Sequence, residues 1–363
     1  MNRWPRDIAF VVGTLGQGGA ERQLYYMVRL LVDEGVRVRV FTLEASEYWE
    51  APLTALGVDV VSFGQRHGRL TRLAKLLNLV GRDLPEIIHS QHFYTNLYAT
   101  LVARTLRIQE VGSVRNRVAC SLLNVGHVMG RLSLKLPRTL VCNSAKAVGD
   151  AKVLRGAKSV TELLPNMVDL ETFCLRSDNS KGSTFRLLGV GRLVPEKRFD
   201  RFLEVVARIV KRCPDPIRAG IVGDGPLRSQ LESRALELGL GSEVLSFHGN
   251  LSNIVPLLHQ SDCLLLTSAT EGTPNVILEA MSCGLPVVAT DVGGVSAILI
   301  DHETGFLAVG DDIDGMADRV LELYHDQSKR AAFGARGRVV VEERFSEALF
   351  KRKLYELYSS CLA

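Results

Sequence analysis

Short apolar segments alternate with amphipathic segments along the whole chain, and this alternation constrains the fold more than any other feature. The apolar segments have the length of buried strands, and the segments between them have the apolar spacing of helices. Strands that alternate with helices indicate a parallel sheet covered by helices on both faces. In the first half we expect a helix over 21–33 and strands at 8–12, 36–43, 58–62, 87–89, 111–114 and 140–142.

The same alternation begins again in the second half of the chain. Residues 165–183 interrupt it with a proline and a polar run at 177–183. Beyond them we expect a helix over 200–211 and strands at 185–190, 219–222, 244–247, 263–267 and 286–289. We therefore predict an α/β protein with two Rossmann-like domains that face each other across a cleft. The first comprises residues 1–165 with a returning C-terminal helix at about 347–363, and the second comprises 166–346.

The composition is that of an ordinary globular protein, because 46% of the 363 residues are hydrophobic and 23% are charged. This balance excludes a disordered chain and a collagen-like repeat. The net charge of +4 is too small to indicate a nucleic-acid-binding protein. It is unevenly distributed, with 22 Lys and Arg against 13 Asp and Glu through residue 165 and 22 against 27 thereafter. A basic first half suits anionic lipid or a phosphorylated substrate, and an uneven solvated surface explains it equally well.

The seven cysteines are scattered and are never spaced as C-x-x-C. This usage is typical of reduced cytoplasmic thiols, and no group of His, Cys and acidic residues has the spacing of a metal site. The start of the chain lacks the apolar core of a signal peptide, and no run reaches 18 consecutive apolar residues. We therefore expect a cytoplasmic protein without a cofactor or metal, whose contact with a membrane would be peripheral.

Residues 66–82 form a basic and amphipathic segment. Leu70, Leu73, Leu77 and Val80 fall on one helical face, with Arg and Lys side chains around it. The favoured interpretation is a helix that packs this apolar face on the core. The alternative is a helix that lies in the interface of an anionic membrane.

The strongest chemical motif is Glu-Gly-Thr-Pro-Asn-Val-Ile-Leu-Glu at 271–279, directly after an expected strand. Thr273 is a good N-cap and Pro274 suits the first helical position, so we expect a helix to begin there. Its free N–H groups and its dipole would bind phosphate at the carboxyl edge of the sheet. Glu271 and Glu279 flank that position and suit the hydroxyl groups of a sugar and a ribose. The alternative is an ordinary capped helix with one solvated Glu.

A second motif, Gly-Val-Gly-Arg-Leu-Val-Pro-Glu-Lys at 189–197, leaves a strand and enters a helix. Its glycines allow a ligand to approach the backbone. Arg192 and Lys197 place two cations at the carboxyl end of the strand, where a guanidinium and an ammonium suit a diphosphate. The alternative is a surface loop in which Arg192 pairs with Glu196.

A glycine-rich sequence at 13–21 follows the first strand and brings backbone N–H groups close to a ligand at a helix start. It lacks the G-x-G-x-x-G pattern, so a dinucleotide site has weak support, although Glu44 lies about where a ribose-binding acid would. A similar turn at 223–226 is more often structural than functional. No P-loop sequence occurs.

Two histidines, His89 and His92, lie at the end of an expected strand. Either side chain suits a general base or a polar clamp. A single histidine is more often structural, but two near a predicted cleft favour a functional role.

Together these motifs resemble the retaining glycosyltransferases of family 4, which have the GT-B fold. The resemblance covers most of the chain, and its pieces occur in the order of the family. They are the segments 18–21, 165–169, 191–197, 222–226, 271–280, 283–290 and 293–294.

The resemblance implies a nucleotide-sugar donor, a UDP- or GDP-sugar, bound in the second domain. Arg192 and Lys197 would hold its diphosphate, and Glu279 would bind its ribose hydroxyls. Glu271 would contact the sugar. Backbone groups near the sugar and the phosphate would come from a further set: Gly191, Gly272, Thr273, Pro274 and Asn275.

The resemblance also implies that the first domain binds the acceptor. Gly18 and Gly19, beside Glu21, would close over the donor from that domain. The acceptor would be a hydroxyl group of a glycan or of a lipid-linked intermediate, in the assembly of a cell-surface polysaccharide or glycolipid. The basic first half of the chain suggests that this takes place at the inner face of the cell membrane.

Two positions depart from the pattern of the family. The family often has His-x-His after the fourth strand, whereas Gln91 stands at the second position here. A further histidine commonly follows the next strand, and Arg115 takes its place. His92 is our candidate for the missing catalytic histidine.

The expected reaction retains the configuration of the sugar and needs no metal. The acceptor hydroxyl would attack the anomeric carbon from the face from which the diphosphate leaves. Two other classes stay open. A catalytically silent protein would bind a sugar nucleotide without releasing the nucleotide. A nicotinamide-dependent oxidoreductase would share the paired α/β units, but the missing G-x-G-x-x-G argues against it.

Overall fold

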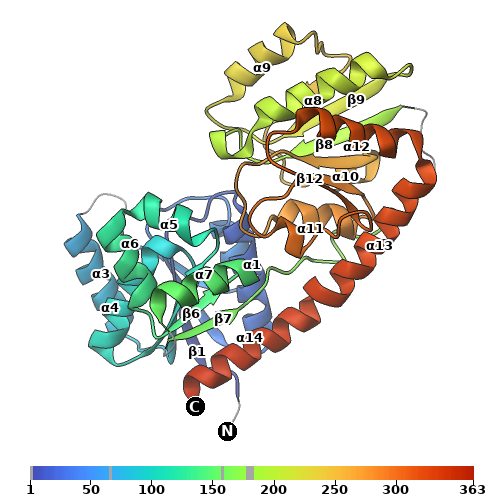
Figure 1. Cartoon of the computed structure of the whole chain (residues 1–363). Coiled ribbons are helices and arrows are strands. Elements are labelled where there is room, and N and C mark those ends of the chain that lie inside the picture. Colours follow the sequence, from blue (N-terminus) through green and yellow to red (C-terminus); the bar gives the residue numbers. More distant parts are fainter. Residues whose placement is uncertain (1–2, 65–67, 157–158, 177–183) are drawn as a thin grey trace. The chain divides into compact units, whose positions relative to one another are not determined.

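The computed structural model describes residues 3–64, 68–156, 159–176 and 184–363, so Arg66 and the polar run at 177–183 lie outside the described residues. The chain divides into two compact units (Figure 1). One contains Met1–Met167 and Ala348–Ala363, and the other contains Val168–Glu347. The division falls two residues after the boundary predicted from the sequence.

The first unit is built on a seven-stranded parallel sheet in the order β3-β2-β1-β4-β5-β6-β7. Ile8 of β1 pairs with Val38 of β2 on one side and with Ile87 of β4 on the other. The strand order reverses at this point, and such a topological switch point is where ligands bind in open α/β sheets. The strands are β1 (Asp7–Val12), β2 (Arg37–Thr42), β3 (Asp59–Ser62), β4 (Ile87–Ser90), β5 (Gln109–Val114), β6 (Thr139–Cys142) and β7 (Val160–Leu163).

Helices cover both faces of this sheet because successive side chains of a strand point to opposite faces. In β1, Phe10 packs in the cluster that holds α1 and α14, whereas Val11 packs in the cluster that holds α3 and α4. Every residue of β1 from Ile8 to Val12 is fully buried. The helices of this unit are α1 (Gly19–Asp33), α2 (Glu50–Ala55), α3 (Arg69–Gly81), α4 (Asn96–Leu106), α5 (Val118–Val125), α6 (His127–Lys135), α7 (Ala145–Arg155) and α14 (Glu347–Leu362).

The C-terminal helix α14 belongs to the first unit (Figure 1, red). Phe350, Leu354 and Leu357 are buried in the same cluster as α1 and β1. Tyr358 donates or accepts a 2.7 Å hydrogen bond with Nδ1 of His89, deep in the sheet. Apolar burial of this kind contributes roughly 1.5–3 kcal/mol per side chain, which explains why the helix returns to this unit.

The second unit repeats the arrangement with a six-stranded parallel sheet in the order β10-β9-β8-β11-β12-β13. Its switch point lies between β8 and β11, where Cys263 pairs with Leu187. The strands are β8 (Phe185–Val190), β9 (Ile217–Val222), β10 (Leu245–Phe247), β11 (Cys263–Leu266), β12 (Val287–Thr290) and β13 (Gly305–Ala308).

Helices again pack on both faces of the second sheet. Leu187 and Leu188, neighbours in β8, belong to two different core clusters. One cluster holds α8, α9 and α12, and the other holds α10, α11 and α13. These helices are α8 (Phe199–Arg212), α9 (Arg228–Glu237), α10 (Val255–Gln260), α11 (Asn275–Ser282), α12 (Ile313–His325) and α13 (Gln327–Phe345). The prediction of two parallel α/β units is confirmed.

Three local expectations were incomplete or wrong. Two strands of four residues each, β7 and β13, were not predicted; each lies at one of the two edges of its sheet. The sequence analysis also placed Leu70 on the apolar face of α3, but that side chain is 83% exposed. The rest of the predicted face does pack on the core, because Val80 is fully buried and Leu73 and Leu77 are partly buried against the same cluster, to which α3 also contributes the fully buried Leu76.

No helix among the described residues is long and apolar enough to cross a membrane.

Candidate functional site

The two motifs predicted to bind the donor lie on either side of the switch point of the second unit. The segment 191–197 follows β8, and the segment 267–275 follows β11, the neighbouring strand. The N–H of Ala269 donates to the carbonyl of Glu196 at 2.8 Å, and Oγ1 of Thr267 donates to the carbonyl of Arg198 at 2.9 Å. These bonds tie the two loops together at the edge where ligands bind in this class of sheet.

Lys197 and Glu271 form an ion pair between these loops. Nζ of Lys197 lies 2.6 Å from Oε1 of Glu271, and Oγ of Ser268 donates to the same oxygen at 2.6 Å. The Glu271 side chain is only 8% exposed, whereas that of Lys197 is 24% exposed. The ammonium group of the pair is therefore partly exposed to solvent, whereas its carboxylate is nearly buried and is held by two hydrogen bonds.

Arg192 lies at the surface of the loop after β8. Its side chain is exposed, and it has no ion-pair partner within the described part of the chain, so the alternative pairing with Glu196 does not occur there. The loop itself is held from the other side, because Gly191 and Leu193 donate to the carbonyls of Val222 and Asp224. Arg192 is thus an exposed charge on an anchored backbone.

Gly223 explains the turn that the sequence analysis considered structural. It has a φ of +131°, and a Cβ atom there would lie 2.0 Å from the carbonyl oxygen of Gly191. Only glycine permits both the conformation and the approach. The turn after β9 therefore supports the loop that carries Arg192, in agreement with that interpretation.

Helix α11 begins beside the ion pair. Pro274 is the N-cap and Asn275 the first helical residue, so the expected cap at Thr273 was one residue too early. The cause is that Pro274 has an extended ψ of 113° and does not enter the helix. Glu279 is buried one turn further along.

The loop after β12 holds the Glu271–Gly272 peptide in place. The N–H of Gly294 donates to the carbonyl of Gly272 at 2.8 Å. Gly293 has a φ of +62°, and a Cβ atom there would lie 1.8 Å from the carbonyl oxygen of Glu271. Three loops, after β8, β11 and β12, thus fix the backbone around Glu271.

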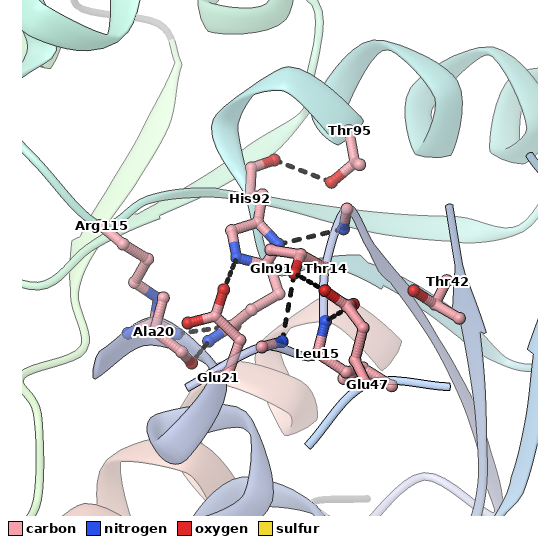
Figure 2. Close-up of polar contacts among 12 residues, drawn as sticks. Thr14, Leu15, Ala20, Glu21, Thr42, Glu47, Gln91, His92, Thr95 and Arg115 are labelled. Carbon is pink, nitrogen blue, oxygen red and sulfur yellow. Dashed lines mark hydrogen bonds and ion pairs between the residues drawn. The ribbon is translucent and has the colours of Figure 1, made fainter. Parts of the chain in front are cut away.

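The first unit has a second polar cluster at its own switch point, between β1 and β4 (Figure 2). The N–H of Gly13 donates to Nδ1 of His92 at 3.1 Å, so Nε2 carries the ring proton. Nε2 lies 3.1 Å from Oε1 of Glu21, to which it donates. His92 thus links the glycine-rich loop to α1 with both ring nitrogens occupied.

Glu47 is a residue of this cluster that the sequence analysis missed. Its carboxylate accepts a 2.5 Å hydrogen bond from Oγ1 of Thr14 and a second one from the N–H of Leu15 (Figure 2). Glu44, the acid singled out from the sequence, has an exposed side chain instead. No signal in the sequence distinguished the two, because their distance from β2 differs by only three residues.

His89 does not belong to this cluster, so its interpretation as a base or a clamp is wrong. It lies within β4 and is fully buried. Nδ1 bonds with the hydroxyl of Tyr358 and Nε2 bonds with Oγ of Ser113 at 3.0 Å. Burial lowers the pKa of His89 well below its usual value, so the ring is neutral and structural.

Gln91 and Arg115 follow β4 and β5 at the same edge. Nε2 of Gln91 donates to the carbonyl of Ala20 at 2.7 Å, and Nη2 of Arg115 donates to Oε1 of Gln91 at 3.3 Å (Figure 2). The residues that replace the expected histidines are therefore joined to each other and to the start of α1.

No group of three or more His, Cys, Asp or Glu side chains able to hold a metal ion occurs among the described residues.

Comparisons with known proteins identify the family. The model of the "Glycosyl transferase 4-like domain" matches residues 18–170, and the model of "Glycosyl transferases group 1" matches residues 175–340. The chain belongs to the family 4 type of glycosyltransferases. The resemblance stated from the motifs is confirmed.

Curated glycosyltransferases are similar to this chain in sequence. The lipopolysaccharide core biosynthesis glycosyltransferase LpsD of Rhizobium meliloti is 27% identical, over 96% of this chain and 96% of its own length. A GDP-mannose-dependent monoacylated alpha-(1-6)-phosphatidylinositol monomannoside mannosyltransferase of Corynebacterium glutamicum is 30% identical, over 56% of this chain and 58% of its own. For this relative and two further curated relatives, the chain spans about half of the relative's length, with shares of 58%, 41% and 52%.

The crystal structure of HepE from Anabaena in complex with UDP-glucose shares the fold. It has a TM-score of 0.86 and 21% identity, over 98% of this chain and 99% of its own. The predicted GT-B fold class is confirmed.

Proposed function

We propose that this protein is a retaining glycosyltransferase that moves a sugar from a nucleotide-sugar donor to a hydroxyl acceptor without a metal ion. The observation that carries the proposal is the Lys197–Glu271 pair at the switch point of the second unit, between Arg192 and the start of α11. A cation at the surface and a helix N-terminus suit the diphosphate of a donor, and a fixed carboxylate suits the hydroxyl groups of its sugar.

The diphosphate of the donor would be held by Arg192 and Lys197. The exposed guanidinium of Arg192 offers a fork of N–H donors, and Lys197 offers a compact ammonium. The first N–H groups of α11, near Asn275, add partial positive charge. Negative charge grows on the diphosphate as the bond to the sugar breaks, so these groups stabilise the transition state more than the bound donor.

The sugar and the ribose would be oriented by the two glutamates. Glu271 sits below Lys197, and one of its oxygens already accepts bonds from Lys197 and Ser268. Sugar hydroxyls donate well to such a carboxylate. Glu279 lies on α11 and would bind the ribose, and backbone groups of Gly191 and of Gly272, Thr273 and Pro274 would line the donor.

The acceptor would bind at the switch point of the first unit, where the loop of Gly18 and Gly19, beside Glu21, would close over the donor. His92 is our proposed positioning residue there, because its two nitrogens are engaged by Gly13 and Glu21 and neither is free to take a proton. In a front-side reaction the departing diphosphate oxygen is the base: it takes the acceptor proton while the sugar–diphosphate bond breaks and the new glycosidic bond forms.

The product would belong to a cell-surface polysaccharide or glycolipid, made on the cytoplasmic side of a membrane. Two relatives support this proposal, since one is named for lipopolysaccharide core biosynthesis and another for a phosphatidylinositol mannoside. A lipid-linked acceptor would bring the basic first unit to an anionic membrane.

A nucleotide-release screen tests the proposed function. The purified chain is incubated with UDP-, GDP- and ADP-sugars, with and without a membrane extract as the acceptor. We expect one nucleotide to be released faster when the extract is present, equally in EDTA, and an unchanged anomeric configuration in the product by NMR. Release that needs Mg²⁺ or Mn²⁺, or an inverted product, would contradict those parts of the proposal.

A catalytically silent sugar-nucleotide-binding protein is the second candidate, and it is favoured by Gln91 and Arg115, which stand where the family commonly has histidines. It predicts that a donor binds in calorimetry while no nucleotide is released with any acceptor fraction. The release screen and the calorimetry together separate the two candidates.

A further inference from the structure

Arg115 is a buried cation that the proposed reaction does not use. It follows β5 directly, at the edge of the first sheet where Gln91 and His92 also lie (Figure 2). The residue as a whole is half-buried, but its Nε and Nη1 atoms are inaccessible to solvent.

Most of the hydrogen-bonding capacity of this guanidinium is unused. Nη2 donates to Oε1 of Gln91 at 3.3 Å and lies 3.8 Å from the sulfur of Met27. Nε and Nη1 have no partner within the described residues. They carry three of the five N–H donors of a guanidinium, so its positive charge is met by one neutral amide oxygen and one thioether.

The titratable groups around Arg115 supply no negative charge at neutral pH. They are His89, Cys142 and Tyr358. Burial raises the pKa of Cys142 to about 12 and raises the pKa of Tyr358 well above its usual value, so both are protonated. Burial lowers the pKa of Arg115 itself to about 10, which still leaves it charged. No carboxylate among the described residues lies within ion-pair distance of it.

A buried charge without a counter-charge is costly, and proteins retain one chiefly where a ligand completes it. We propose that Arg115 binds an oxyanion, a carboxylate or a phosphate, carried by a substrate at the switch point of the first unit. The inference rests on the proposed function, because it names a chemical class for one of the two substrates. The oxyanion would enter from the exposed side of the residue, and a rotation of the Arg115 side chain would turn the unused donors, which are buried in this structure, toward it.

The oxyanion has two possible sources. It is the carboxylate of an acidic sugar if it belongs to the donor, or a phosphate next to the attacking hydroxyl if it belongs to the acceptor. Both present several acceptor oxygens to a guanidinium. If the donor carries the oxyanion, the protein should bind a charged donor more tightly than a neutral one. If the acceptor carries it, the protein should bind a charged acceptor more tightly.

The first arm of the experiment measures donor binding by calorimetry. UDP-glucose is compared with UDP-glucuronate, or GDP-mannose with GDP-mannuronate if the protein binds GDP. If the donor carries the oxyanion, we expect the acidic form to bind about 10- to 100-fold more tightly, because a charge-assisted hydrogen bond contributes roughly 1.5–3 kcal/mol. Arg115→Met removes this preference and leaves the affinity for the free nucleotide unchanged.

The second arm measures acceptor binding to protein saturated with the nucleotide. Glucose 6-phosphate is compared with glucose. If the acceptor carries the oxyanion, we expect a preference for the phosphorylated sugar of about 10-fold or more, lost in Arg115→Met. Arg131→Met, at an exposed arginine of α6, is the matched control and keeps the preference of the unmodified chain.

Three outcomes decide the inference. A charge preference in either arm that depends on Arg115 supports it and assigns the source. Nucleotide binding without a charge preference in either arm, in the unmodified chain itself, overturns it and leaves the proposed function standing. Absence of any nucleotide binding overturns the proposed function, and the inference falls with it. If Arg115→Met does not fold, Arg115→Gln, which keeps a polar side chain without the charge, replaces it.

Discussion

At the residue scale, the ion pair of Lys197 and Glu271 carries the proposed donor site. The carboxylate has a second partner in Ser268 and is nearly buried, so it keeps its place when the lysine is removed. Lys197 contributes charge at the surface of the site rather than packing, and Arg192 makes no ion pair at all in the described structure. Losing either cation should therefore affect catalysis far more than folding.

We predict that Lys197→Ala and Arg192→Ala each slow sugar transfer by roughly 10²–10³, because one preorganised group that stabilises the leaving diphosphate is lost. Nucleotide release under single-turnover conditions measures the effect, and the melting temperature reports the fold. Lys211→Ala, at an exposed lysine in the last turn of α8, is the control and keeps full activity. Near-normal turnover in both site variants would remove these residues from the proposed mechanism.

Glu47 acts on the glycine-rich loop of the first unit through the bond to the N–H of Leu15. We predict that Glu47→Ala increases hydrogen exchange at the Leu15 amide by about 10-fold, because the N–H loses its acceptor. Glu44→Ala, three residues earlier with an exposed side chain, serves as the matched control. Equal exchange in both variants would show that the loop holds its shape without this carboxylate.

At the scale of elements, the sequence predicted the strands best where they are central and apolar. All six strands expected in the first unit and all five expected in the second were found, with ends shifted by one or two residues. The missed strands, β7 and β13, are short edge strands. Edge position alone does not explain why they were missed, because β3 and β10 are also edge strands and were predicted. In β7 the apolar residues Val160 and Leu163 are exposed, so its sequence does not show the alternation of buried apolar and exposed polar residues that indicates a strand.

The return of the C-terminal helix to the first unit was predicted, but the hydrogen bond between His89 of β4 and Tyr358 of α14 could not be, because it joins residues 269 positions apart. His89 was selected as a functional residue for its chemistry and its place near a strand end. Its partners, Tyr358 and Ser113, show that it ties the C-terminal helix to the sheet. A histidine of this kind makes stability depend on pH.

We predict that the first unit loses stability as the pH falls below about 6.5. In the folded unit the pKa of His89 lies well below 6.5, whereas in the unfolded chain it is about 6.5. The unfolded chain therefore binds one more proton in acid, and the free energy of unfolding falls by up to about 1.4 kcal/mol per pH unit until the pH reaches the folded pKa.

Urea unfolding at pH 7, 6 and 5 measures this slope. Both tryptophans, Trp4 and Trp49, belong to the first unit, so their fluorescence reports its unfolding. In His89→Gln, the decrease in the free energy of unfolding per pH unit should be smaller by the contribution of one proton. His302→Gln, at an exposed histidine of the second unit, is the control and should leave this decrease unchanged. The same slope in all three proteins would show that His89 does not titrate on unfolding.

At the scale of the whole molecule, the six-stranded sheet repeats the order of the first six strands of the seven-stranded sheet, and this repetition explains why the residues of the proposed donor site could be predicted to lie together. The segments 191–197 and 267–275 follow β8 and β11, which are neighbours at the switch point. Their residues therefore lie close together at the carboxyl edge of the sheet. The cluster of the first unit was less predictable. Glu47 reaches its loop from a neighbouring connection, and Arg115 is recognisable only by the hydrogen bonds that it does not make.

The uneven charge of the chain leads to the last prediction. Helix α3 exposes Leu70 (83%) beside Arg69, and Leu84 (55%) lies just beyond its end beside Arg82. Exposed leucines beside arginines suit the interface of an anionic membrane, where the side chain is buried and the charge meets phosphate. We predict that the protein sediments with vesicles of anionic lipid at low salt, and much less at 0.5 M salt, since screening removes the electrostatic attraction.

Leu70→Asp tests the orientation of this contact, because it places a negative charge at the most exposed position of α3. It should weaken vesicle binding about 10-fold or more, by losing apolar burial and adding repulsion from the lipid phosphates. Leu236→Asp makes the same change at a leucine of α9 that is 73% exposed and belongs to the second, acidic unit. Two results would contradict this prediction: both variants bind vesicles as the unmodified chain does, or the unmodified chain does not bind anionic vesicles at low salt. The exposed side of α3 would then be only a solvated surface, and a lipid-linked acceptor would have to reach the first unit by another route.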